Sequence, residues 1–512
     1  MATPRKKTTK KKAVTLVTTV TTTNEPWRWT IAEAGLALRN RDISAVELTQ
    51  AHLDRIDALD PQIHAYLTVT PEVALAQAAD ADRRLQQGED LTPLTGIPLG
   101  LKDVLVTKGI RTTAGSKFLE HFVPPYNGTV VTKLQSAGAV TLGKLNMDEF
   151  AMGSSTENSA YETTRNPWDL ERVPGGSSGG SAVSVAAGIA MGTLGSDTGG
   201  SVRQPGALTN TVGMKPTYGR VSRFGLIAFS SSLDQIGPFT RDARDCAIMM
   251  QQIAGYDPMD ATSVMEPVPD YLAALTGDVK GLRIGIPKEY FVDGTEPGVT
   301  KAVEAAIATF KELGAETVDI SLPHTRYGLA AYYIIAPAEA SANLSRYDGV
   351  KYGLSLRENA VDLDDVLTRT REAGFGPEVR RRIMLGTYAL SSGYYDAYYK
   401  RAEQIRVLIR QDFDAAFAKC DIIISPTSPT VAFKIGDRTQ DPYSMYLADL
   451  FTIPANLAGI CGLSMPGGFS EGLPVGVQLL GNRFDEATIL RAADAFERVT
   501  DFHLQWPKIA DR

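Results

Sequence analysis

The chain has 512 residues, a formal net charge of −7, 43% hydrophobic residues and 22% charged residues. This is the composition of a globular protein with a large buried core, and its acidic balance argues against a protein that coats nucleic acid. The sparse cysteines (Cys246, Cys420 and Cys461) argue against a disulfide framework or a zinc site, and no apolar run reaches 18 residues. We therefore expect a cytoplasmic protein.

The first 28 residues form a segment of their own, rich in Lys and Thr and free of acidic residues before Glu25. We interpret residues 1–28 as a basic, disordered extension, with organellar targeting as the less favoured alternative. Residues 29–512 are predicted to form a single α/β body with helical insertions at about 325–420.

Two helices are predicted within residues 30–61, followed by a third at 71–88. Thr30, with Glu33 three positions later, has the pattern of a capping box. Either Asp42 or Ser44 caps the second helix, and Pro61 is expected to end it.

After Pro93, short apolar runs alternate with helical patterns. Such alternation is typical of an α/β protein, so we predict a central mixed β-sheet covered by helices on both faces. The expected strands are 96–106, 139–146, 282–290, 316–323 and 420–429, and the expected helices are 128–138, 298–314 and a long stretch at 377–420 interrupted at Gly386 and Gly393.

Two runs of Gly and Ser, at 172–188 and 195–206, carry the chemical signal. Neither contains the Gly-Lys-Ser/Thr sequence of a phosphate loop or the dinucleotide fingerprint. A flexible linker does not fit either, because residues 181–195 are predicted to continue as a close-packed helix. Nucleophilic catalysis by serine remains, yet no histidine lies within these runs to act as the base.

Lysine is the known substitute for histidine as the base of a serine nucleophile. Lys102 lies in "GIPLGLKDVLV" with apolar neighbours on both sides, so burial is expected to favour its neutral form.

The three segments "GIPLGLKD", "VPGGSSGGSA" and "LGSDTGGSVRQPG" together resemble the amidase signature family. The resemblance implies a Lys–Ser–Ser triad, in which Lys102 is the base, Ser177 a bridging serine on a cis peptide, and Ser201 the nucleophile. Backbone amides of the second run would stabilise the oxyanion, and these are Thr198, Gly199 and Gly200, together with Ser201 itself.

Further segments, from about residue 31 to the C-terminus, resemble the A subunits of bacterial-type aspartyl/glutamyl-tRNA amidotransferases. This resemblance implies a glutaminase whose ammonia passes to a B subunit, in a complex with a C subunit, to amidate Glu or Asp on charged tRNA. It also implies that Arg381 binds the carboxylate of glutamine, Asp449 its ammonium group, and that Tyr332 lines the pocket. The sequence departs from the family at Thr209-Asn210, where Cys-Gly is usual.

Two other functions remain open: a stand-alone amidase of small amides, and a non-catalytic scaffold, against which the intact triad argues. We expect no metal or organic cofactor in this chain, since it has neither a ligand cluster nor a phosphate loop. By the resemblance, ATP and Mg²⁺ would act in the partner subunit.

Overall fold

The computed structural model describes residues 25–89, 91–291 and 294–511. Most of the predicted extension at 1–28 lies outside these ranges, and its last residues, Pro26–Arg28, form a short 3₁₀ helix. Within the described ranges, the helices include none that is both long enough and apolar enough to cross a membrane.

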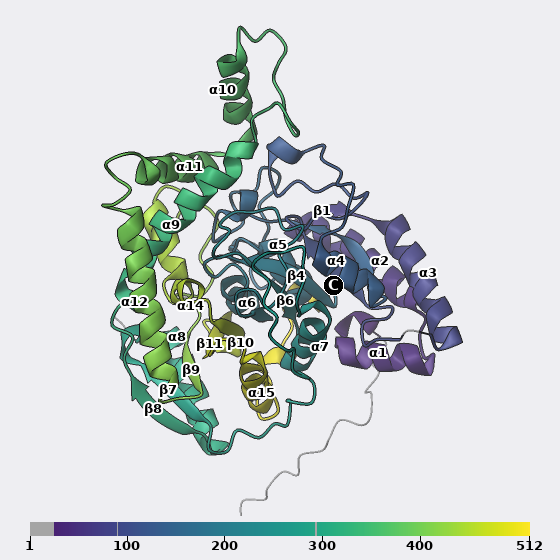
Figure 1. Ribbon diagram of the computed structural model, residues 1–512. Coiled ribbons are helices and arrows are strands. Elements are labelled where there is room, and N and C mark those ends of the chain that lie inside the picture. The colour runs from purple at the N-terminus through teal and green to yellow at the C-terminus, as the bar shows by residue number, and fades with distance from the viewer. Residues whose placement is uncertain (1–24, 90, 292–293, 512) are drawn as a thin grey trace, which may run out of the picture.

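The core of the molecule is one eleven-stranded mixed sheet, flanked by helices as predicted (Figure 1). Its strand order is β1-β3-β2-β4-β6-β5-β10-β11-β9-β7-β8. The strands are β1 (Tyr66–Val69), β2 (Pro98–Lys102), β3 (Val140–Leu145), β4 (Gly192–Asp197), β5 (Val212–Lys215), β6 (Gln235–Thr240), β7 (Arg283–Pro287), β8 (Glu316–Ile320), β9 (Ile422–Pro426), β10 (Cys461–Ser470) and β11 (Leu473–Gly481).

Three strands near the first Gly/Ser run are parallel: β3 pairs with β2, and β2 pairs with β4. Every residue of these strands is buried, which fits strands covered on both faces.

The helices are α1 (Ile31–Asn40), α2 (Ala45–Ile63), α3 (Pro71–Gln87), α4 (Thr129–Ser136), α5 (Gly179–Ala186), α6 (Arg203–Thr209), α7 (Ala243–Ile253), α8 (Pro297–Glu312), α9 (Gly328–Asn343), α10 (Leu363–Gly374), α11 (Pro377–Leu390), α12 (Tyr399–Phe417), α13 (Pro442–Tyr446), α14 (Ile453–Ala458) and α15 (Glu486–Glu497).

The predicted starts of the first two helices are confirmed. Thr30 and Glu33 form a capping box at α1, and Ser44 rather than Asp42 caps α2 in the same way. The prediction that Pro61 ends α2 is wrong by two residues, because the helix continues to Ile63. Pro61 lies in the last turn, and the chain leaves the helix at His64, which adopts a left-handed conformation.

The prediction of one continuous helix over 181–195 is also wrong. The helix α5 ends at Ala186, Gly188 has a φ of +69°, and the chain then enters β4 at Gly192. A positive φ is readily adopted by glycine and ends an α-helix. The turn at Gly188 therefore separates the two Gly/Ser runs into a helix start and a strand end.

The long helical stretch at 377–420 is interrupted once, and not at Gly386. The helix α11 passes through Gly386, whose missing side chain allows close contact with the backbone carbonyl of Pro337 in α9. The interruption falls at residues 391–398, where Gly393 has a φ of +88°. Gly386 is thus a packing glycine and Gly393 a turn glycine.

Candidate active site

The three predicted triad residues come from three neighbouring elements of the sheet's parallel region. Lys102 is the last residue of β2, Ser177 lies just before α5, and Ser201 lies between β4 and α6. Since β2 and β4 are adjacent and parallel, their C-terminal ends meet at one edge of the sheet. This edge is where ligands bind in open α/β sheets.

The amine of Lys102 is surrounded by hydroxyl groups. Its Nζ donates to the Oγ of Ser177 at 2.8 Å, to that of Ser178 at 2.8 Å and to that of Ser196 at 2.9 Å. The lysine side chain is fully buried, and its Nζ forms no ion pair with a described residue. The structure thus brings Lys102 and Ser177 into direct contact, as the triad requires.

Burial lowers the pKa of Lys102 to about 7, although the negative charge of Asp148 opposes this shift. A buried ammonium without a paired carboxylate is poorly solvated, and this favours the neutral amine. A neutral amine has a lone pair that can accept a proton from Ser177. Lys102 is therefore suited to serve as a base near neutral pH.

Ser177 is held in place through its backbone. The Gly176–Ser177 peptide is cis, as the resemblance implied. The carbonyl of Ser177 accepts a hydrogen bond from the amide of Asp148 at 3.2 Å, and the amide of Gly176 donates to the side chain of Gln204 at 3.0 Å. These contacts orient the Ser177 hydroxyl toward Lys102.

Ser201 follows a loop with free backbone donors. Within the described ranges, the amides of residues 198–201 donate no hydrogen bond to the protein. The Thr198 hydroxyl donates to Asp234 at 2.7 Å and so fixes the start of the loop. Amides that are fixed and unpaired can bind a developing oxyanion, so this loop has the donors that the sequence predicted.

A buried ion pair anchors the end of the same loop. Arg203 Nη2 lies 3.0 Å from Asp197 Oδ1, and both side chains are fully buried. Burial acts to raise the pKa of Asp197, but the charge of Arg203 outweighs this effect and lowers the pKa to about 2. Asn456 donates to the same carboxylate at 2.8 Å. The pair fixes the two residues that flank the nucleophile loop, at the end of β4 and the start of α6.

Tyr332 and Asp449, both predicted to bind substrate, pack directly against the nucleophile loop. A Cβ added at Gly199 would lie 2.8 Å from the Tyr332 ring, and one at Gly200 would overlap the Thr452 hydroxyl and lie 3.3 Å from Asp449. The Thr452 hydroxyl donates to the carbonyl of Gly199 at 2.6 Å. The glycines of the loop are therefore required by this close contact.

Asp449 is a buried carboxylate with one hydroxyl partner. Ser154 donates to its Oδ2 at 2.5 Å, and burial raises the pKa of Asp449 to about 7. A bound ammonium group would favour its ionised form. Asp449 is thus placed to bind a cation beside the loop.

The sequence prediction named Arg381 for this site, whereas the structure places Arg382 on the inner side of α11. Arg381 is exposed on the outer face of α11 and pairs with Glu378. Arg382 is buried, its Nε donates to Glu378 at 2.7 Å, and its guanidinium lies 5.2 Å from the ring centre of Tyr333 and 5.5 Å from that of Tyr446.

Helix geometry explains this correction. Consecutive residues of an α-helix point about 100° apart, so only one of Arg381 and Arg382 can face the core. Arg382 shares its face with Val379, Gly386 and Ala389, all of which are buried. Tyr333, adjacent to Tyr332, lies against this guanidinium, so Arg382 and not Arg381 lies on the side of α11 that faces these tyrosines.

The comparisons with known proteins agree with this geometry. The sequence model of the amidase family matches residues 47–490, which is most of the chain. The chain belongs to the amidase signature family. The amidase is 62% identical over 480 residues to a protein of Roseiflexus sp. (strain RS-1) that is named as the A subunit of glutamyl-tRNA(Gln) amidotransferase, covering 94% of this chain and 98% of the relative. It is 61% identical to the protein of that name from Geobacter metallireducens, covering 93% and 98%.

Solved structures of amidase-type enzymes have a similar fold. The crystal structure of the glutamyl-tRNA(Gln) amidotransferase A subunit from Thermotoga maritima superposes with a TM-score of 0.78 at 46% identity, covering 93% of this chain and 95% of the other. A peptide amidase from Stenotrophomonas maltophilia superposes with a TM-score of 0.80 at 32% identity, covering 94% and 98%. The fold of the amidase is therefore that of the signature enzymes.

Several residues of the site were missed by the sequence analysis. Ser178 and Ser196 bind the Lys102 amine, Ser154 binds Asp449, and Thr452 holds the nucleophile loop. Ser178 and Ser196 lie inside the two Gly/Ser runs, so their hydroxyls could have been considered as lysine partners. Ser154 and Thr452 carry no such local signal, because each acts on a residue that is distant in sequence.

The departure from the family at Thr209-Asn210 is accommodated by local contacts. Asn210 ends α6 in a left-handed conformation with a φ of +61°, which asparagine tolerates better than most residues. Its side chain donates to the carbonyl of Phe502 at 2.8 Å, while the Thr209 hydroxyl donates to that of Pro205 at 2.7 Å. The change lies at the far end of α6 from Ser201.

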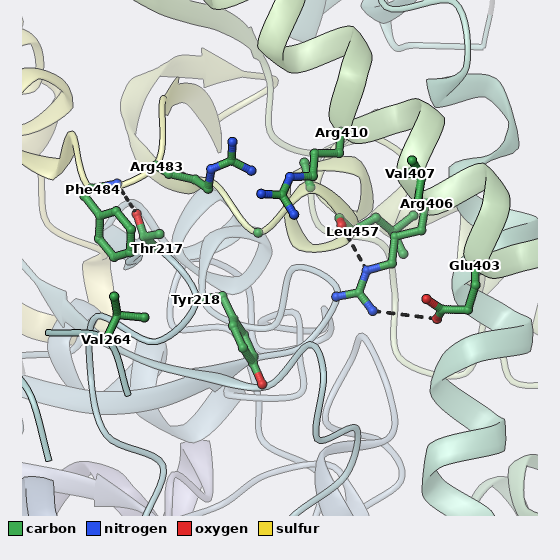
Figure 2. Close-up of a pocket in the computed structure, with 12 residues that line it drawn as sticks. Thr217, Tyr218, Val264, Glu403, Arg406, Val407, Arg410, Leu457, Arg483 and Phe484 are labelled. Atoms are coloured by element: carbon green, nitrogen blue, oxygen red, sulfur yellow. Dashed lines mark hydrogen bonds and ion pairs between the residues drawn. The ribbon is translucent and has the colours of Figure 1, made fainter. Parts of the chain in front are cut away.

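A separate cavity of about 430 Å³ lies beside α12 and α14 (Figure 2). Figure 2 shows Arg406 reaching Leu457 and Glu403, and its Nε donates to the Leu457 carbonyl at 3.1 Å. No triad residue lines this cavity. It is therefore separate from the triad, although α14 lies between the two, since Thr452 immediately precedes this helix and Leu457 lies within it.

Proposed function

We propose that this amidase is the glutaminase subunit of a tRNA-dependent amidotransferase. The observation that carries the proposal is a pair of opposite charges, the carboxylate of Asp449 against the nucleophile loop and the buried cation of Arg382, whose charge acts on Asp449. A free amino acid carries one charge of each sign, and this pair matches both. The 61% to 62% identity to A subunits over almost the whole chain supports the same substrate.

Glutamine binds with its carboxylate on Arg382 and its ammonium group on Asp449. Only the Nε of Arg382 has a hydrogen-bond partner among the described residues, so its terminal nitrogens are free to bind a carboxylate with two hydrogen bonds. Tyr332 forms a wall of the pocket against Gly199. The side-chain amide then lies over Ser201.

The reaction proceeds in two halves. Ser201 attacks the amide carbon while its proton passes through Ser177 to the neutral amine of Lys102. The amides of residues 198–201 bind the oxyanion. The C–N bond breaks, the proton returns through Ser177 to the leaving nitrogen, and ammonia departs from a glutamyl ester on Ser201. Water then hydrolyses the ester to glutamate by the same proton route.

The released ammonia passes to a B subunit in a complex that also holds a C subunit. There it converts Glu-tRNA(Gln) to Gln-tRNA(Gln), and the same chemistry would convert Asp-tRNA(Asn) to Asn-tRNA(Asn). In this proposal the amidase itself binds no cofactor, and ATP and Mg²⁺ act in the partner. The complex is expected to work in the cytoplasm, where charged tRNA is used.

The proposal is tested by measuring ammonia release from glutamine with and without the B and C subunits, ATP and charged tRNA. We expect release to increase with the complete system, and Ser201→Ala or Lys102→Ala to abolish it. Release that does not respond to these additions would favour a stand-alone small-amide amidase. Full activity of Ser201→Ala would rule out Ser201 as the nucleophile, and full activity of Lys102→Ala would rule out Lys102 as the base.

A further inference from the structure

The helix α11 carries large exposed apolar side chains on its outer face, next to Arg381. Its inner face packs on α9 and holds Arg382, while its outer face carries Met384, Leu385 and Tyr388 at helical spacing. Met384 is 72% exposed and Tyr388 is 49% exposed. Large exposed apolar side chains that gather in one patch often mark a protein interaction site. The outer face therefore resembles a surface that is covered in the working protein.

The exposed face continues into the turn after α11. Tyr388 lies 4.3 Å from Tyr394 between ring centres, and Tyr394 lies 6.0 Å from Tyr398. Rings that pack on one another are already ordered before a partner binds, which lowers the entropic cost of association. We call this surface the tyrosine face, and its members are Met384, Leu385, Tyr388, Leu390, Tyr394, Tyr395 and Tyr398.

The area of the tyrosine face is that of an interface. Apart from Met384, its members are between 37% and 49% exposed. With roughly 150–250 Å² for a large side chain, the whole face amounts to roughly 500–800 Å². The largest apolar patch of a monomer is about 300–600 Å², and one side of a stable interface covers about 800 Å². The tyrosine face could therefore supply most of one side of such an interface.

The charges around the face define the partner. Four exposed basic residues lie within residues 377–401, where Arg381 pairs with buried Glu378 and Lys400 pairs with Asp396, the only exposed carboxylate of this range. The chain as a whole carries a net charge of −7, so this basic rim is a local exception. A partner should be apolar at its centre and acidic at its edge. The basic residues are Arg380, Arg381, Lys400 and Arg401.

We propose that the tyrosine face binds the protein subunit that receives the ammonia, an inference that rests on the proposed function. The position supports this choice, because α11 carries the pocket residue Arg382 on its other face, so the partner binds one helix away from the glutamine site. Figure 1 shows α11 at the upper left of the molecule, below α10, and α12 along its left edge.

The test compares Met384→Glu and Tyr388→Glu with Met265→Glu. Met265 is 76% exposed and lies outside the tyrosine face, so it is a matched control for Met384. Each full-length variant is titrated with the purified B and C subunits, and its glutaminase activity is measured alone. We expect the two face variants to weaken binding at least about tenfold and to keep the activity of the free chain. Met265→Glu should bind like the wild type, and higher salt should weaken the wild-type complex.

Each other outcome overturns a specific part of the reasoning. If the wild type binds the subunits and both face variants bind equally well, the tyrosine face is not the interface, while the proposed function stands. If the wild type does not bind the subunits at all, both proposals fail. A wild-type homodimer that Tyr388→Glu converts to a monomer would assign the face to self-association, and loss of direct tRNA binding in the variants would assign it to RNA.

Discussion

Changing pH between 6 and 8 perturbs the protonation state of the proposed base, Lys102. Burial among three serine hydroxyls lowers its pKa from 10.5 to about 7. With this pKa the neutral fraction is about 0.1 at pH 6, about 0.5 at pH 7 and about 0.9 at pH 8. Only the neutral amine accepts the proton, so activity is expected to increase with pH by about tenfold across this range.

The assay is steady-state glutaminase activity of the whole chain, with kcat and KM determined separately at each pH. Separation matters because burial also raises the pKa of Asp449 to about 7. Ionised Asp449 binds the glutamine ammonium, so its titration should lower KM as the pH rises. In the enzyme–substrate complex Asp449 is already paired, and the pH dependence of kcat then reports on Lys102.

Lys102→Arg is the matched variant, because a guanidinium keeps the positive charge and cannot act as a base. We expect it to remain folded and to lose activity at every pH between 6 and 8. A wild-type kcat that stays flat over this range would contradict the assignment of a neutral lysine base. Substantial activity of Lys102→Arg would contradict it independently.

Three further predictions concern the pocket and its loop. Arg382→Gln should raise the KM for glutamine at least about tenfold, whereas Arg381→Gln should change it less than about threefold, since Arg382 is buried and Arg381 is exposed. Equal effects of the two variants would contradict the choice of Arg382 over Arg381. Gly200→Ala should lower kcat at least about tenfold, because Gly200 has a φ of +144° and lies too close to Thr452 to accept a Cβ. Unchanged kinetics of this variant would mean that the loop can shift to accept the Cβ. Arg203→Met should lower the free energy of unfolding by about 3–5 kcal/mol in urea denaturation, because it leaves Asp197 buried without its cation; a loss below about 1 kcal/mol would mean that the pair is not structurally important.

The contact between Lys102 and Ser177 was expected from the resemblance of three short motifs to the amidase signature family. The mixed α/β fold could be predicted, since short apolar runs between glycines and prolines indicate buried strands. Local signals also indicated the helix start at Thr30 and narrowed the next start to Asp42 or Ser44, of which the structure shows Ser44. The strand and helix signals depend on residues that are close together in the chain.

Choices that depend on distant contacts could not be made. Arg381 and Arg382 both lie on apolar stripes of α11, so periodicity alone did not show which stripe faces α9. Gly386 resembles a helix breaker until the carbonyl of Pro337 is seen against it. The stretch 181–195 contains small and apolar residues that suit a helix or a buried strand, and only Gly188 marks the change.

The strand order has a consequence for how the enzyme is made. The hairpin of β10 and β11, near the C-terminus, pairs with β5 on one side and β9 on the other, in the interior of the sheet. Gln478 in β11 accepts a hydrogen bond from Arg203, close to the nucleophile. A ribosome therefore releases almost the whole chain before the catalytic loop can be completed, and until then the open edges of β5 and β9 are exposed to aggregation. Nascent chains of this amidase should depend on chaperones late in synthesis, and truncation of the last strands should remove activity even though the triad residues remain.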